Sequence, residues 1–196
     1  MHLTILKKKS CALKEFIEFW AQFYDEGKYP DSIYKANLNM DGKLQKDNII
    51  PLLEWKNGQP LSKAKKNIAN KVIKNLQKFN DFRVLKTVSQ EYFKQFWELV
   101  SNIVKTGLIW KVYLFHIARP NDYPIVDQHV LRAHRYLTTG KIAEPPQTLE
   151  TYNTYKNFFH KITKESGKKP REVDKALMTF GQYLASQFSK LLSNQT

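Results

Sequence analysis

Cysteine is nearly absent from this sequence: Cys11 is the only one in 196 residues. A single cysteine excludes a disulfide within the chain, and it excludes zinc or iron–sulfur sites built from several cysteine ligands. No run approaches the ~20 consecutive apolar residues of a membrane-spanning helix, and the apolar part of MHLTILKKKS is too short for a signal peptide. We therefore expect a cytoplasmic protein with no membrane partner.

Acidic residues are also scarce. The chain has 18 Asp and Glu against 32 Lys and Arg, which gives a formal net charge of +14. An excess of this size favours an anionic partner, of which nucleic acid is the commonest. Most of these cations are lysines, which suit phosphate contacts better than the reading of bases. A lysine-rich surface that is merely solvated is the alternative.

Glycine and proline are few, with 7 and 8 residues, and helical spacing dominates between them. Apolar residues recur at intervals of three and four in most segments. This pattern predicts helices over residues 13–23, 47–56, 62–76, 89–103, 127–136 and 173–191, with a further short one after Asp31. Residues 108–117 are so apolar that periodicity alone leaves helix and strand open. Residues 138–147 are the best candidate for a loop. We expect an all-α protein of about eight helices, forming one domain over residues 1–196.

Residues 99–137 carry the clearest functional pattern. An amphipathic helix is followed by a turn at Lys105, Thr106 and Gly107, by an apolar segment, and by a proline turn before Asp127. Free backbone N–H groups at the start of a helix bind phosphate without help from side chains. Lys105 and Lys111 add positive charge beside that turn. The segment is therefore a candidate for docking on a nucleic-acid backbone.

Residues 125–132 read IVDQHVLR, and this segment is similar to the Val-Asp-x-His-Val-x-Arg signature of the HhH-GPD superfamily of base-excision DNA glycosylases. Residues 103–109 lie where that family places its glycine-containing hairpin. The resemblance implies a two-lobed helical fold with a cleft between the lobes, a monomer, and duplex DNA with an extruded base as the partner. It implies neither a metal nor an organic cofactor for the chemistry.

The resemblance also implies roles for single residues. Asp127 would be the catalytic carboxylate, which stabilises positive charge on the sugar as the base leaves. An ordinary N-cap of the following helix is the other interpretation of Asp127, and the two are compatible. The candidate DNA contacts are Lys105, Thr106, Gly107, Lys111, His129 and Arg132. The candidate walls of a base pocket are Trp55, Trp110, His116 and Tyr123; a position in the hydrophobic core is the alternative for Trp55, Trp110 and Tyr123.

The hairpin departs from the family pattern at two positions. Lys105 stands where the first of two glycines is usual, so that only Gly107 remains. Some members use a lysine just after the hairpin to attack the sugar, and that place falls on Ile109 here. Lys111 lies two residues further on, which is another face of a helix. The sequence therefore predicts a monofunctional glycosylase, a hydrolase without lyase activity.

Two other functions stay open. Pro30-Asp31 followed by Glu54-Trp55-Lys56 fits the loose Pro-Asp…Glu-x-Lys pattern of Mg²⁺-dependent nucleases, but that site needs a strand, and Pro51 interrupts the run before Glu54. The second open function is that of a DNA-binding relative of the glycosylases that has lost the catalytic activity. The substrate base, and a role in repair, restriction or defence, are not readable from the sequence.

Overall fold

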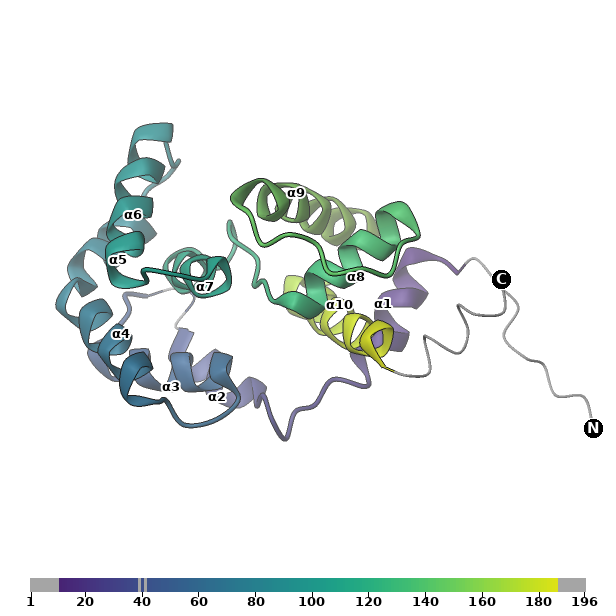
Figure 1. Ribbon diagram of the computed structural model, residues 1–196, viewed down its shortest axis with the longest axis horizontal. Helices are drawn as coiled ribbons and strands as arrows, with labels where there is room; N and C mark the ends of the chain where they lie inside the picture. The colour runs from purple at the N-terminus through teal and green to yellow at the C-terminus, as the bar shows by residue number, and fades with distance from the viewer. Residues whose placement is uncertain (1–10, 39, 41, 187–196) are drawn as a thin grey trace, which may run out of the picture. The chain divides into compact units, whose positions relative to one another are not determined.

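The computed structural model describes residues 11–38, 40 and 42–186, and within them the chain forms ten helices and no strand (Figure 1). This confirms the predicted all-α class. The helices are α1 (Leu13–Ala21), α2 (Asp31–Leu38), α3 (Lys46–Asn57), α4 (Lys63–Lys74), α5 (Leu76–Arg83), α6 (Gln90–Ile103), α7 (Leu108–Ala118), α8 (Gln128–Thr139), α9 (Leu149–Ser166) and α10 (Pro170–Ala185). No helix in the described ranges combines the length and the apolar character needed to cross a membrane.

The helices belong to two compact units. Unit 1 contains the described parts of Met1–Tyr24, Asp127–Pro145 and Asn153–Thr196, and unit 2 contains those of Asp25–Val126 and Pro146–Tyr152. Unit 1 is therefore assembled from segments far apart in the sequence, whereas unit 2 is nearly one continuous stretch.

Aromatic contacts join the first and last helices of unit 1. Phe16 and Trp20 on α1 lie against Phe180 on α10, with ring centroids 5.1 and 5.0 Å apart. These residues belong to the apolar stripes that predicted both helices, and burial of such a stripe provides most of a helix's stability in a protein. Two residues of the predicted final stripe, Phe188 and Leu191, lie outside the described residues.

The other helices of unit 1 are α8 and the greater part of α9, whose residues 149–152 belong to unit 2. Gly140 ends α8 in the left-handed conformation, with φ of 71°, and the chain runs without helix to Leu149, as the predicted loop required. We did not predict α9. It packs on α8 through Phe158 and Tyr155, whose ring centroids lie 4.8 and 5.9 Å from that of His134.

The core of unit 2 forms around α7. All residues from Val112 to Ala118 are buried, so this helix is apolar on every side and shows no amphipathic period. That burial explains why the apolar periodicity of the sequence did not distinguish a helix from a strand over these residues. The predicted helix over residues 62–76 is in fact divided: Asn75, with φ of −109° and ψ of 16°, separates α4 from α5.

Candidate functional site

Asp127 immediately precedes α8 and caps it. Its backbone is extended, with φ of −151° and ψ of −179°, and its Oδ1 accepts hydrogen bonds from the amides of His129 (2.8 Å) and Val130 (3.0 Å). The predicted N-cap at Asp127 is therefore confirmed. Two main-chain donors fix the half-buried carboxylate in one orientation, which any electrostatic role in catalysis would need.

Very close packing against α10 fixes the helix that Asp127 caps. A Cβ on Gly181 would lie 2.5 Å from the carbonyl carbon of His129 and 2.9 Å from its Cα. Only glycine fits there, because those atoms are backbone and have no rotamer to change. No sequence pattern indicated this contact, since Gly181 lies within an otherwise ordinary helical pattern.

Arg132 lies inside this helix pair. It is 6% exposed, and its Nη1 donates to the carbonyl of Gly181 (2.9 Å) and to Nδ1 of His129 (3.1 Å), while Nη2 is paired with Glu144. Hydrogen bonds of the guanidinium therefore connect α8 to α10 and to the loop that follows α8. Little of the Arg132 surface is left for the phosphate contact expected from the sequence. Burial lowers the pKa of His129, against the opposing influence of the Asp127 carboxylate.

Three of the four candidates for a base pocket lie in the core of unit 2. His116, Tyr123 and Trp55 are 4%, 5% and 6% exposed. His116 Nδ1 lies 2.7 Å from the carbonyl oxygen of Tyr123, and its Nε2 lies 2.7 Å from the hydroxyl of Tyr34. The carbonyl can only accept, so Nδ1 carries the proton and the Tyr34 hydroxyl donates to Nε2. These three residues are core residues, and only Trp110 is partly exposed.

The backbone just before Asp127 is held by side chains from distant parts of unit 2. Lys56 Nζ donates to the carbonyl of Val126 (2.9 Å), and the Tyr152 hydroxyl donates to that of Pro124 (3.3 Å). Buried carbonyls without such donors would cost free energy. The segment that leads into Asp127 is therefore positioned by its own hydrogen bonds. No sequence pattern indicated that Tyr152 contacts this segment, and Lys56 stood out only in the nuclease pattern.

The turn between α6 and α7 has the features predicted for a phosphate contact. Lys105, Thr106 and Gly107 are exposed. Gly107 has φ of 89°, and a Cβ there would meet nothing within 4 Å, so its backbone conformation is what favours glycine. No side chain caps α7, and the first amides of a helix have no acceptor within the helix itself.

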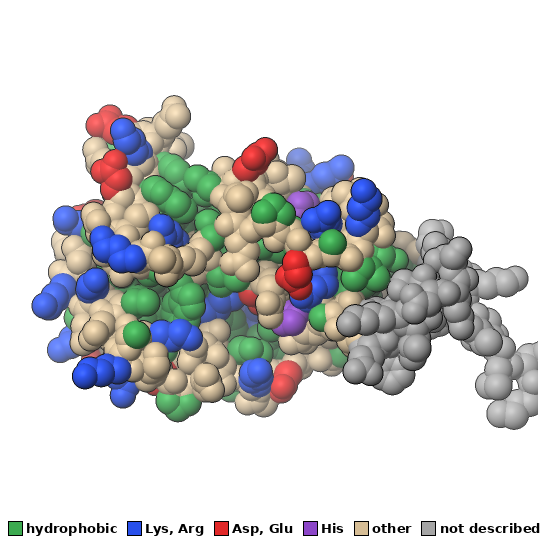
Figure 2. All heavy atoms as spheres, in the orientation of Figure 1, with side chains coloured by type: hydrophobic (Ala, Val, Ile, Leu, Met, Phe, Trp, Pro, Cys, Tyr) green, Lys and Arg blue, Asp and Glu red, His purple; other side chains and the backbone are tan. Residues whose placement is uncertain are grey.

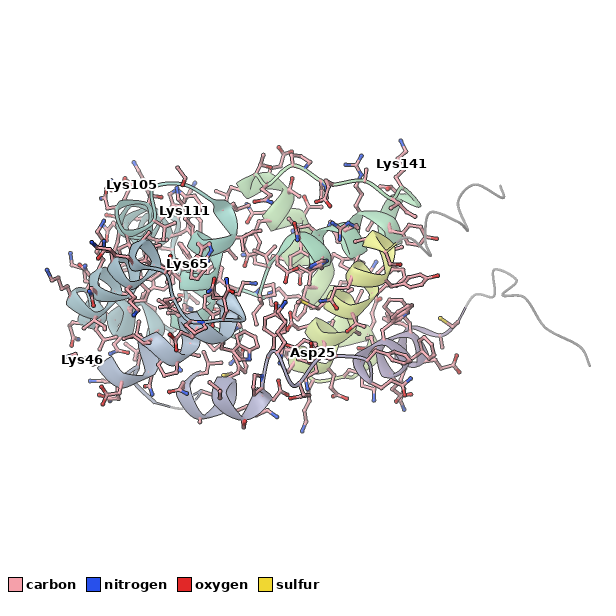
Figure 3. All side chains as sticks on the ribbon, turned by 60° about the horizontal axis from the view of Figure 1, so that its bottom comes forward. Asp25, Lys46, Lys65, Lys105, Lys111 and Lys141 are labelled. Atoms are coloured by element: carbon pink, nitrogen blue, oxygen red, sulfur yellow. The ribbon has the colours of Figure 1, made fainter. Side chains whose placement is uncertain are left out.

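Three lysines lie at this turn or beside the helix that follows it, and the ammonium groups of two of them contact tryptophan rings. Lys65 Nζ lies 4.9 Å from the ring centroid of Trp110, and Lys111 Nζ lies 5.4 Å from that of Trp97. Figure 3 labels Lys65, Lys105 and Lys111 in the same part of unit 2. Contact with an aromatic face attracts an ammonium group, so the positive charge beside α7 is held in place. Lys65 was missed at this site because α4 lies far away in the sequence.

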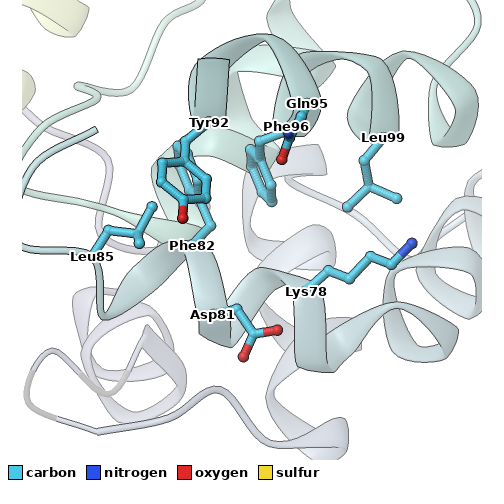
Figure 4. A pocket seen from close by; sticks show the side chains of 8 residues that line it. All are labelled: Lys78, Asp81, Phe82, Leu85, Tyr92, Gln95, Phe96 and Leu99. Carbon is cyan, nitrogen blue, oxygen red and sulfur yellow. The ribbon is translucent and has the colours of Figure 1, made fainter. Parts of the chain in front are cut away.

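A separate pocket of about 370 Å³ lies between α5 and α6 (Figure 4). Phe82 and Phe96, whose rings stack with centroids 4.0 Å apart, form part of its lining, and Lys78 and Asp81 contribute charge. It contains none of the residues predicted for the site.

The nuclease pattern does not form a site of the required kind. Glu54 and Lys56 lie on α3, where residues two apart point to different faces. Glu54 Oε1 accepts from the amide of Leu61 (3.3 Å), whereas Lys56 is bonded to Val126. The strand that would bring both side chains to one metal is a helix here, and this excludes the Glu-x-Lys arrangement.

The chain matches no protein-family model, no curated protein and no solved structure.

Proposed function

We propose that this chain is a DNA glycosylase of the HhH-GPD type, with Asp127 as its catalytic carboxylate. The observation that carries the proposal is the geometry of Asp127: within the segment that resembles the family signature, its carboxylate is fixed by two backbone amides at the start of α8. The proposal includes the two-lobed fold that the resemblance implies, with the two compact units as its lobes.

The proposed reaction is hydrolysis of an N-glycosidic bond. The bond between C1′ and the base breaks, and the bonding electrons leave with the base. The sugar then carries oxocarbenium-like positive charge, which the Asp127 carboxylate stabilises. Water attacks C1′; its hydroxyl stays on the sugar, and a proton is transferred to the departing base. The products are an abasic site and a free base.

Extrusion of the base costs a few kcal/mol, which binding of the duplex must offset. In this proposal the turn before α7 supplies that binding, through main-chain amides and through Thr106, Lys105 and Lys111. Arg132 is left out because its guanidinium is buried, and His129 contributes by accepting a hydrogen bond from Arg132.

The proposed enzyme is monofunctional. An attacking lysine would have to stand at Ile109, and Lys111 is two residues further along α7, about 200° around the helix. Its ammonium group instead lies over Trp97. No Schiff base is therefore part of the reaction.

The test is a panel of duplexes with damaged, deaminated, mismatched and ordinary bases, treated with hot alkali to reveal abasic sites. Asp127→Asn is the informative variant, because an asparagine amide oxygen still accepts the two backbone hydrogen bonds and keeps the cap. We expect alkali-dependent cleavage by wild type and its loss in Asp127→Asn. Asp81→Asn, a matched change on α5, should cleave as wild type does.

Other results would contradict parts of the proposal. Cleavage without alkali would indicate a lysine nucleophile. Full activity in Asp127→Asn would remove the catalytic role of that carboxylate. Tight binding of every duplex with no abasic site would favour the alternative, a DNA-binding relative that lacks the chemistry.

A further inference from the structure

The segment from Trp55 to Asn80 has an unusual charge pattern. It contains seven lysines and neither an aspartate nor a glutamate. All 18 acidic residues of the chain lie outside this segment. Helix α4 occupies the middle of this segment, and Figure 2 shows blue side chains gathered over the part of the surface where Figure 1 places α4.

The lysines of α4 share one side of the helix. At about 100° per residue, Lys63, Lys66, Lys71 and Lys74 fall within an arc of roughly 140°, and all four are exposed. Ala69 and Val72, both fully buried, mark the opposite side. Lys65 is the exception among these lysines, since it turns toward Trp110. We name the four exposed lysines the α4 basic face.

No ion pair within the described chain neutralises the α4 basic face. None of its four lysines is in an ion pair with a described residue. The exposed residues between them include Asn67 and Asn70, which are neutral and can donate hydrogen bonds to phosphate oxygens. Among the described residues, the face therefore presents four lysines outside any ion pair and no acidic residue on α4 itself.

We infer that the α4 basic face is a second DNA-binding surface of unit 2, which holds the phosphodiester backbone outside the turn before α7. The inference rests on the proposed function for the choice of DNA as the polyanion. From Lys63 to Lys74 the helix rises about 16 Å, the axial rise of about five phosphates of one strand. Lys65 connects the two surfaces, because it belongs to α4 and contacts the first turn of α7.

The chemistry of this face favours a nucleic acid over a membrane. A helix that lies on a lipid surface needs an exposed apolar side to insert between the headgroups. The apolar residues Ala69 and Val72 of α4 face the protein interior instead. Charge alone is left for binding, and charge alone is sufficient for contact with a phosphate backbone.

The test compares three variants of the full chain by fluorescence anisotropy, with an undamaged labelled duplex of about 20 base pairs at several salt concentrations. The first changes Lys63, Lys66, Lys71 and Lys74 to glutamine, which has a similar helix propensity. The second changes the exposed lysines of unit 1 at positions 14, 141, 164 and 169 to glutamine, and so removes the same charge elsewhere. The third is Lys105→Gln with Lys111→Gln, which removes two contacts at the turn and should lower the salt slope by about 1.8.

Each neutralised phosphate contributes about 0.9 to the slope of log affinity against log salt. Loss of four contacts should lower that slope by about 3.6 in the first variant. Between about 50 and about 200 mM salt, wild-type affinity should therefore fall roughly a hundredfold more than that of the variant. The unit 1 variant should keep a slope close to that of wild type.

A wild-type slope in the α4 variant would overturn the inference, and so would an equal loss in the unit 1 variant. Tighter binding of wild type to phosphatidylserine vesicles than to duplex, lost in the α4 variant, would make the partner a membrane and overturn it as well. The abasic-site assay separates the two proposals. A lower salt slope in the α4 variant, with no abasic sites formed by wild type, supports the α4 surface and rejects the glycosylase reaction. Abasic sites formed by wild type, with an unchanged salt slope in the α4 variant, support the glycosylase reaction and reject the α4 surface.

Discussion

Replacement of Gly181 by alanine should separate α8 from α10. The added Cβ would overlap the carbonyl oxygen of His129 and stand 2.5 Å from its carbonyl carbon, whereas ordinary contacts begin at 3.4 Å. Because the obstructing atoms are backbone, the two helices must move apart by at least about 1 Å to reach normal van der Waals distance. That movement also stretches the hydrogen bond from Arg132 to the carbonyl of Gly181, now 2.9 Å.

The cost follows from these two effects. Overpacking of a tight contact costs about 1–3 kcal/mol, and a weakened hydrogen bond from a charged donor costs up to about 1.5–3 kcal/mol. Alanine's higher helix propensity returns about 1 kcal/mol. We expect a net loss of about 2–4 kcal/mol, which for a chain of this size lowers Tm by about 4–16 °C.

Differential scanning calorimetry of Gly181→Ala measures this loss. Gly27→Ala is the matched control, because a Cβ there meets only a side-chain oxygen of Asp25, at 3.2 Å; its Tm should stay close to that of wild type. A Gly181→Ala protein that melts with wild type would refute the close contact of α8 with α10, and with it the account of why Arg132 is buried.

Three further predictions concern hydrogen bonding and titration. Lys56→Met removes the donor to the buried Val126 carbonyl and should lower the free energy of unfolding, measured in urea, by about 1–3 kcal/mol. The control Lys46→Met, at an exposed site on the same helix, should leave the free energy of unfolding unchanged. An equal loss in both variants would contradict the role of the hydrogen bond from Lys56. Burial lowers the pKa of His134 below 6.5, so the unfolded chain binds more protons there. Stability should therefore fall as the pH drops through 6.5, and His134→Gln should flatten the decrease measured by urea titrations at several pH values. Burial, with the nearby charge of Asp122, raises the pKa of Tyr123 to about 12 from 10.0. The contribution of Tyr123 to the free energy of unfolding should be fully present below pH 10 and should be lost between pH 10 and pH 12, because the phenol of the unfolded chain loses its proton first. A Tyr123→Phe variant that loses as much stability as wild type over this pH range would contradict this.

Local patterns in the sequence predicted local structure well. The helix start at Asp127 was predicted correctly because an N-cap depends on one side chain and two nearby amides. The break at Asn75 was missed, since Leu76 continues the apolar spacing of the preceding helix and nothing in the local pattern marks the turn. Helix α9 could have been found: Tyr152, Tyr155 and Phe159 are buried and recur at helical spacing.

Features of the site that depend on distant residues were not predictable in this way. Arg132 belongs to an eight-residue motif, but its burial depends on Gly181, 49 residues away. Trp55 and Tyr123 are aromatic residues, which occur in a core more often than in a base pocket, and the fold places both in the core. The position of Lys65 beside α7 likewise depends on packing within unit 2.

The division of the chain also determines the order in which the units can fold during synthesis. Residues 25–126 leave the ribosome as one stretch, so most of unit 2 is available before α8 is made. Helix α1 leaves earlier, yet its contact with Phe180 must wait until α10 has been translated. Contacts of such high sequence separation form slowly, and exposed apolar surface promotes aggregation in the meantime. The aromatic side of α1 therefore lacks its partner on α10 for most of the time that the chain is being translated.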